Sequence, residues 1–258
     1  MAATRPSRRD GMPVVPHRQH AIAASLLAGI AAGEWGPDQR LPVERELAER
    51  YGCTRITLRQ ALQQLEAEGR IYRENRRGWF VSPARIRYDP TSIAGFMQYV
   101  AAQGRIPRTE LLSARRQPAS ADLAARMALA TPQEEVFVLH RRRWIDRRAV
   151  LLETNVLRTD WAPALLDHDL AGSLGAVLDT MGLHLARSRL SLFPAALDAR
   201  QATLLHSTAG APCLHLQRLN YDADDRIVEL DLESWRHDAL EVGVDVAALP
   251  TEHLATDL

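Results

Sequence analysis

The chain has 258 residues, of which 46% are hydrophobic and 25% charged, and its 32 basic residues are balanced by 32 acidic ones. This length is typical of two globular domains, each large enough to bury a core. No run of about 18 apolar residues is present, so the sequence predicts no membrane-spanning helix. Residues 1–16 lack the apolar segment of a secretory signal, and we expect a cytoplasmic protein.

The balanced total hides an asymmetry between the two ends of the chain. Residues 1–90 contain 15 arginines and 10 acidic residues, a net charge of +5, and the remainder carries −5. A basic N-terminal part joined to an acidic C-terminal part predicts a polyanion-binding module attached to a module of another kind.

The first 33 residues predict an arm followed by a helix. Residues 1–16 contain arginines and prolines without an apolar pattern, and we expect a disordered arm. A helix is predicted from about residue 18 to residue 32, because Ile22, Leu26 and Ile30 recur every four residues and Gly33 follows. It should pack across two further helices and complete a three-helix unit.

Residues 41–69 predict two short helices joined by a tight turn. Gly52 lies where a left-handed backbone is needed after the first helix, and Gly69 where the second should end. Thr54 is expected to cap the second helix by accepting a backbone N–H bond. The residues expected to face inward share helical spacing: Leu47, Ala48, Tyr51, Leu58, Leu62 and Leu65.

The outward face of the second helix is polar and basic at its start. Arg55, Thr57, Arg59 and Gln60 are of the types that contact phosphates and base edges, and the positive end of the helix dipole favours an anion there. The pattern predicts a recognition helix for the major groove of DNA. The alternative is an ordinary helical hairpin with a solvated basic face.

A β-hairpin is predicted to follow, with strands at residues 71–73 and 78–81. In a winged helix such a hairpin tip lies beside the duplex. Arg76, Arg77 and the Gly78 backbone would then reach phosphates or the minor groove. A solvated turn is the alternative.

Residues 17–82 resemble the GntR family of bacterial regulators. The family motif runs leucine-proline-x-glutamate-arginine-glutamate-leucine-alanine, then threonine/serine-arginine-x-threonine-x-arginine-x-alanine-leucine, and all of these positions are present from Leu41 to Leu62. Val43 departs from the serine that usually caps the first motif helix, so we expect a slightly frayed helix start. The resemblance implies a winged helix-turn-helix domain at residues 17–82. The DNA-binding residues that it implies are Arg45, Thr54, Arg55, Thr57, Arg59, Arg77 and Gly78.

The remaining sequence alternates strand and helix patterns. We expect a linker at residues 83–92 and a second domain at residues 93–249, with antiparallel strands joined by short loops. The predicted fold class is α/β two-domain, an N-terminal winged helix-turn-helix followed by a C-terminal α+β domain on an antiparallel sheet. Strands are expected at residues 109–117, 136–145, 150–157, 184–193, 213–221 and 227–237. Helices are expected to end at Gly104 and to span residues 121–129, 173–181 and 198–206.

The second domain resembles the UTRA effector domain that defines the HutC subfamily. The motifs that carry the resemblance are the runs at residues 139–146, 152–153, 172–174, 228–229 and 236–238. The resemblance implies a chorismate-lyase-like fold that binds small molecules. The effector-binding residues that it implies are Arg141, Arg143, Ser173, Glu229 and Trp235.

Strand alternation places Arg141 and Arg143 on one strand face, together with Leu139. Free N–H groups at the helix that Ser173 begins are suited to an anion. Trp235 stands where many relatives have tyrosine, so its contact with the ligand would lose a hydroxyl.

Alternation also places Glu229, Asp231 and Glu233 on one face of the last strand. Asp231 stands where a serine is common, and a second carboxylate near Glu229 favours a ligand that bears an amine. Two alternatives stay open: a solvated arginine face paired with acids, and an exposed acidic face of an edge strand.

No metal site and no cofactor are expected. Cys53 and Cys213 lie far apart, as expected for reduced thiols in the cytosol. The candidate histidines His140, His184 and His215 lack the spacing of metal ligands.

We therefore expect a sequence-specific transcriptional regulator, a repressor of a catabolic or uptake operon as is usual in this family, and no enzyme. A homodimer would bind double-stranded operator DNA as an inverted repeat, with half-sites about one helical turn apart.

The expected effector is a small anionic metabolite. Residues 87–91, 104–112 and 235–238 resemble regulators of phosphonate uptake and breakdown, including that of 2-aminoethylphosphonate. The alternatives are a sugar phosphate, a urocanate-like catabolite, a chorismate-lyase-like enzyme, and a DNA-binding protein without an effector.

Overall fold

The computed structural model describes residues 16–92 and 94–246. The chain divides into two compact units with a boundary between Pro83 and Ala84. The arm predicted at residues 1–16 lies, apart from Pro16, outside the described residues. Over the described ranges, no helix is both long enough and apolar enough to cross a bilayer.

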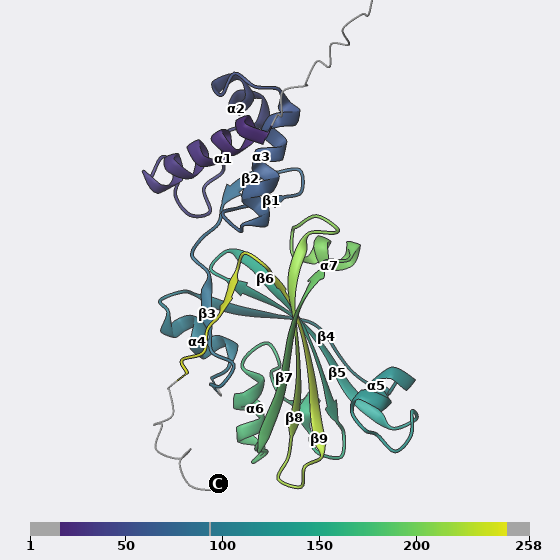
Figure 1. Cartoon of the computed structure of the whole chain (residues 1–258). Helices are drawn as coiled ribbons and strands as arrows, with labels where there is room; N and C mark the ends of the chain where they lie inside the picture. The colour runs from purple at the N-terminus through teal and green to yellow at the C-terminus, as the bar shows by residue number, and fades with distance from the viewer. Residues whose placement is uncertain (1–15, 93, 247–258) are drawn as a thin grey trace, which may run out of the picture. The chain divides into compact units, whose positions relative to one another are not determined.

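Unit 1 consists of three helices followed by a hairpin (Figure 1). Its elements are α1 (Pro16–Ala31), α2 (Glu44–Arg50), α3 (Arg55–Ala67), β1 (Ile71–Glu74) and β2 (Gly78–Val81). The two strands pair antiparallel, with Ile71 opposite Val81. Five leucines from the three helices are completely buried, so the helical spacing predicted this core correctly: Leu26, Leu47, Leu58, Leu62 and Leu65.

Two of the predicted glycine positions have the backbone that the turn requires. Gly52 has a φ of +56° and Gly69 a φ of +71°. Side chains with a β-carbon rarely adopt these angles, so glycine allows each helix to stop within one residue. The short turn after α2 then leads directly into α3.

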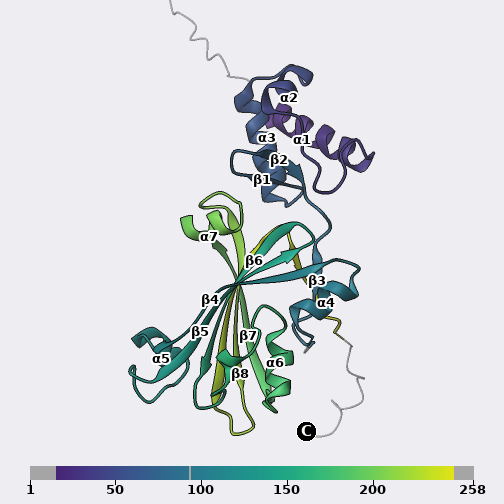
Figure 2. The ribbon, with the colours of Figure 1, turned by 180° about the vertical axis from the view of Figure 1, so that it is seen from behind.

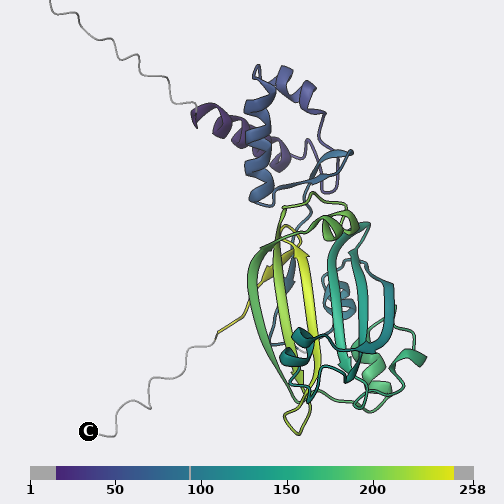
Figure 3. The same ribbon diagram turned by 90° about the vertical axis from the view of Figure 1, so that its right-hand side faces the viewer.

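Unit 2 is built on a six-stranded antiparallel sheet in the order β4-β5-β6-β9-β8-β7, whose long strands run side by side (Figure 3). The predicted fold class is thereby confirmed. The sheet strands are β4 (Pro107–Pro118), β5 (Glu135–Ile145), β6 (Arg148–Arg158), β7 (Arg187–Ala196), β8 (Pro212–Tyr221) and β9 (Ile227–Arg236). The other elements are β3 (Ile86–Tyr88), α4 (Phe96–Ala102), α5 (Ala121–Arg126), the 3-10 turn η1 (Leu165–Asp167), α6 (Leu174–Thr180), α7 (Ala199–Leu204) and β10 (Leu240–Val242).

Helices cover both faces of the sheet (Figures 1 and 2). Leu174 and Leu178 of α6 pack with Leu139 of β5, and α4 covers the same face farther along through Phe96. On the opposite face, α5 packs with the alternate residues of β5, and α7 packs over β6 and β8. Because successive strand residues point to opposite faces, β5 contributes to both layers.

One expectation and one alternative for unit 2 need correction. Residues 86–88, within the predicted linker, form strand β3, which pairs in parallel with β10 and buries Ile86 and Tyr88. The sequence did not predict this three-residue strand, because prolines flank it and its partner lies about 150 residues farther along the chain. Strand β9, which was considered as an edge strand, lies between β6 and β8.

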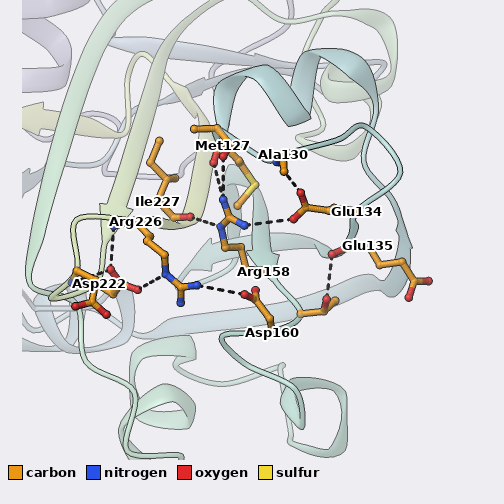
Figure 4. A network of polar contacts seen from close by, with 12 residues as sticks. Met127, Ala130, Glu134, Glu135, Arg158, Asp160, Asp222, Arg226 and Ile227 are labelled. Carbon is orange, nitrogen blue, oxygen red and sulfur yellow. Dashed lines mark hydrogen bonds and ion pairs between the residues drawn. The ribbon is translucent and has the colours of Figure 1, made fainter.

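Two arginines tie together one end of the sheet (Figure 4). Arg158 at the end of β6 donates to the carbonyl of Ile227 on β9 at 2.8 Å and to the carbonyl of Met127 after α5 at 3.2 Å. Arg226 forms ion pairs with Asp222 at 3.0 Å and with Asp160 at 3.3 Å. These contacts fix the β8–β9 turn against the end of β6.

The start of α2 yields a stability prediction. Val43 occupies the N-cap position with an extended backbone and makes no side-chain capping bond, as its departure from serine led us to expect. Val43→Ser should stabilise unit 1 by about 1 kcal/mol relative to Val43→Ala, because only serine can accept a free N–H of the first turn. Urea unfolding followed by helical circular dichroism measures the difference. Equal stability of the two variants would show that α2 needs no cap.

Candidate functional site

The start of α3 is fixed by its predicted cap. The Thr54 hydroxyl accepts the backbone N–H of Thr57 at 3.2 Å, and the two threonine hydroxyls lie 2.9 Å apart. Leu58 points into the core, and the opposite side of the helix is exposed. The exposed residues on this side are Arg55, Ile56, Arg59, Gln60 and Gln63. A capped, positively charged helix start on an exposed face is suited to polyanion binding.

The predicted DNA-binding arginines differ in their partners. Arg59 forms an ion pair with Glu44 at 2.7 Å, and Arg45 forms one with Glu49 at 3.0 Å. Arg55 is exposed and forms no hydrogen bond or ion pair with the residues that the structure describes. Arg55 is thus available to a new partner without first breaking a contact. The others must exchange a carboxylate for a phosphate or base.

The hairpin tip has the backbone of a tight turn. Arg76 has a φ of +63° and Gly78 a φ of +103°. A β-carbon at Gly78 would lie 3.3 Å from the Arg40 guanidinium, so glycine also allows a close approach. Arg77 is exposed, pairs with Glu74 and stacks on Phe80 at 5.3 Å. The tip therefore presents two arginines to solvent.

A cavity of about 150 Å³ lies in unit 2, on the face of the sheet that α4 and α6 cover. Its wall combines β3, α4, α6 and four sheet strands. Register explains how distant residues meet there: Arg141 lies opposite Glu153, and Glu153 lies opposite Glu233. A second row lies two residues farther along β6 and β9. There, Asn155 of β6 lies opposite Asp231 of β9, which lies opposite Arg218 of β8.

One carboxylate serves both predicted arginines. Glu153 lies 2.8 Å from Arg141 and 2.8 Å from Arg143. Both arginines are buried, which contradicts the alternative of a solvated arginine face. Burial opposes ionisation of Glu153, but the two guanidinium groups outweigh it and lower its pKa. Arg141 also donates to Asn155 at 3.1 Å, whereas its Nη1 is buried without a hydrogen-bond partner in the described structure.

Three further carboxylates line the same cavity. Glu229 accepts from Asn155 at 3.0 Å and from Asn220 at 2.8 Å. Asp231 accepts from Asn155 at 3.1 Å, and Trp235 donates to Glu233. All three carboxylates are buried, so the alternative of an exposed acidic face is wrong.

The three carboxylates lack the pairing that Glu153 has. Within the described residues, Glu229, Asp231 and Glu233 form no ion pair within 4.0 Å. Burial raises the pKa of each of the three carboxyl groups, and mutual repulsion adds to the effect at Asp231. Arg218, the third arginine of the wall, lies among them and bonds to the Tyr88 hydroxyl. The ionised cavity would hold four carboxylates and three guanidinium groups.

The remaining predicted residues are placed differently. Ser173 lines the cavity, and its hydroxyl accepts the Ala176 N–H at 3.3 Å as the cap of α6. Trp235 is buried beside the cavity without lining it and packs against Phe96 with 6.0 Å between ring centres. The indole N–H of Trp235 donates to Glu233 and thereby orients that carboxylate.

Sequence reasoning missed part of the wall. Glu153 was noted within a motif, but its pairing with Arg141 depends on cross-strand register. Asn155, Arg218 and Asn220 carried no motif at all. The prediction of no metal site considered histidine and cysteine. Ligand oxygens of Glu153, Asp231 and Glu233 lie within 4.8 Å of one another, a grouping that a cation would suit.

Comparisons with known proteins agree with this division of the chain. Residues 18–81 match the bacterial regulatory proteins of the gntR family, and residues 102–241 match the UTRA domain. Among curated proteins, the uncharacterized HTH-type transcriptional regulator YihL of Escherichia coli K12 is 29% identical over 211 residues, covering 81% of this chain and 89% of YihL. The HTH-type transcriptional repressor NagR of Bacillus subtilis is 28% identical over 201 residues, covering 78% of this chain and 82% of NagR.

A solved structure extends the similarity to both units. The crystal structure of PhnF from Mycobacterium smegmatis covers 88% of this chain and all of its own, with a TM-score of 0.62 and 28% identity. The UTRA match alone spans more than half of the sequence. The chain therefore belongs to the UTRA-domain regulators of the GntR family, as a DNA-binding transcriptional regulator and not an enzyme.

Proposed function

We propose that this regulator represses a catabolic or uptake operon and that a small metabolite bound in unit 2 controls its affinity for operator DNA. The observation that carries the proposal is the pairing of an exposed, capped basic helix in one unit with a buried, charged cavity in the other. As a homodimer, the chain would bind an inverted repeat with two copies of α3 in successive major grooves.

In unit 1, α3 would enter the major groove with its N-terminal turn toward the bases. Arg55 and Arg59 would contact guanine edges or phosphates, while Thr54 and Thr57 hold the helix against the backbone. Arg45 lies at the start of α2, and Arg77 with Gly78 at the hairpin tip. Arg45, Arg77 and the Gly78 backbone would contact phosphates on either side of α3, because in a winged helix the first motif helix and the hairpin flank the recognition helix.

In unit 2, the charge balance indicates the chemistry of the effector. Glu153 balances one of the two positive charges of Arg141 and Arg143, and the three other carboxylates form no ion pair within 4.0 Å with residues that the structure describes. Buried carboxylates need protons or a cation, because an isolated buried charge is strongly unfavourable. We therefore propose an effector that carries a protonated amine beside Glu229, Asp231 and Glu233.

The opposite end of the effector would be anionic. The Arg141 Nη1 donor has no described partner, and Arg143, Arg218 and Ser173 line the same cavity. A phosphonate or carboxylate oxygen would accept from the Arg141 Nη1 donor. A small zwitterion such as 2-aminoethylphosphonate combines both groups and is the molecule that we propose to test first. Sugar phosphates lack the amine unless they are amino sugars.

The wall of the cavity also suggests how binding would reach the DNA-binding unit. Tyr88, Gly95 and Phe96 line it and lie between about 5 and 13 residues beyond the boundary at Pro83. An effector that shifts β3 or α4 would move the chain that leads into unit 1. Control of DNA binding would follow if the effector has different affinities for the two arrangements.

Removing Arg55 tests the DNA-binding half. Arg55→Ala should weaken operator binding by about 1–3 kcal/mol for each half-site, because each copy of α3 loses one guanine or phosphate contact and no intramolecular ion pair of Arg55 is broken in exchange. Fluorescence anisotropy at fixed salt measures it. Arg115→Ala, an exposed arginine of unit 2, serves as the control. Unchanged affinity of Arg55→Ala would contradict the placement of α3.

The two ends of the effector are tested by removing each in turn. Calorimetry should show 2-aminoethylphosphonate binding at least about tenfold more tightly than ethylphosphonate or ethanolamine, since each of these lacks one charge-assisted contact. Asp231→Asn should reduce the advantage of the amine, and Asp224→Asn, an exposed acid, should not. Equal binding of ethylphosphonate would exclude a cation subsite. Binding of Mg²⁺ or Ca²⁺ alone would assign the carboxylates to a metal.

The acidic cluster also predicts how stability depends on pH. Burial raises the pKa of Asp231 above its unfolded value, so the folded chain retains protons and the free energy of unfolding falls as pH rises from about 4. Asp231→Asn should stabilise unit 2 by about 1–2 kcal/mol at pH 8, with little effect at pH 4. Denaturant unfolding at both values measures this. A variant that is destabilised equally at both values would indicate a merely structural contact.

A further inference from the structure

Ile56 is a large apolar side chain on the otherwise polar outer face of α3. It is the second residue of the helix, and 74% of it is exposed. Its neighbours on this face, Arg55, Arg59, Gln60 and Gln63, are all polar. An isoleucine at this position leaves its hydrocarbon in water.

Neither packing nor helix formation explains this residue. The inward side of α3 is formed by Leu58, Leu62 and Leu65, which are completely buried, and Ile56 lies outside their cluster. Ile56, Gln60 and Gln63 follow the i, i+4, i+7 spacing of a single outward stripe. Isoleucine is also a weaker helix former than the straight-chain residues, because its branched β-carbon loses side-chain freedom.

We propose that Ile56 recognises a thymine through its C5-methyl group. In the major groove, thymine presents this methyl group as its apolar feature, and an aliphatic side chain is its natural contact. Ile56 lies between Arg55 and Thr57 in the helix turn that would lie deepest in the groove. The polar neighbours would fix the position of the helix, and Ile56 would select one base step. The proposal rests on the placement of α3 in the major groove.

A thymine methyl can be removed without altering base pairing, which makes a sharp test. An operator is first selected in vitro with the full-length chain, and each thymine is then replaced singly by deoxyuridine. One replacement in each half-site should raise the Kd about fourfold, the value of one buried methyl group. Ile56→Ala removes the contact from both half-sites, so it should bind the unmodified operator more weakly by about the square of that factor, roughly 16-fold, and be insensitive to the single replacement. Ile56→Val should retain partial sensitivity.

Ile106 provides a matched control, because it is an isoleucine of unit 2 that is 70% exposed. Ile106→Ala should keep the deoxyuridine sensitivity of the unchanged chain. Circular dichroism of each variant verifies folding. The proposal is overturned if the unchanged chain tolerates every deoxyuridine, if Ile56→Ala remains sensitive at the same position, or if selection shows no preferred thymine.

A variant of Arg55 separates the two levels of failure. If Arg55→Ala weakens binding while no deoxyuridine has an effect, α3 lies in the groove and Ile56 does not recognise thymine. If Arg55→Ala binds fully and the deoxyuridine scan is also flat, the groove placement itself is wrong. Exposed single apolar residues are common on protein surfaces, and a flat scan would class Ile56 with them.

Discussion

The sharing of one carboxylate by two buried arginines is the interaction on which the effector unit depends. Glu153 lies 2.8 Å from both Arg141 and Arg143, in the middle of the sheet. This pairing keeps two guanidinium groups buried, and it also removes them as a simple anion clamp. Because Glu229, Asp231 and Glu233 lie on the neighbouring central strand, the cavity carries more negative charge than its arginine motif suggests. Protons or a cation must balance that excess, because an unbalanced buried charge is strongly unfavourable.

The position of the cavity connects this charge balance to regulation. Its wall includes β3 and the start of α4, the first elements after the unit boundary at Pro83. Strand β3 is held by only three residue pairs with β10. A segment with so few backbone bonds responds more readily to a ligand than a central strand does. A change at the effector would therefore reach the chain segment that leads to the DNA-binding helices.

Much of the fold could be predicted from the sequence, because local signals specify it. Helical spacing identified the leucine core of unit 1, and Thr54 and Gly52 marked the turn before α3. Strand alternation placed Arg141 and Arg143 on one face. Register and order in the sheet have no such local signal, so the central position of β9, the pairing of Glu153 and the strand β3 could not be predicted. The sequence did not predict that Ile56 is exposed, because its exposure depends on how the helix is oriented in the core.

The protonation of the carboxylates in the cavity is the most direct measure of the central claim. Carbon-13 NMR of labelled Glu and Asp carboxyl groups, assigned with single variants, would follow Glu229, Asp231 and Glu233 through a pH titration. The account predicts that they titrate above the range of exposed carboxylates and that 2-aminoethylphosphonate shifts their pKa values downward. Ordinary titration near pH 4, unchanged by the ligand, would contradict it.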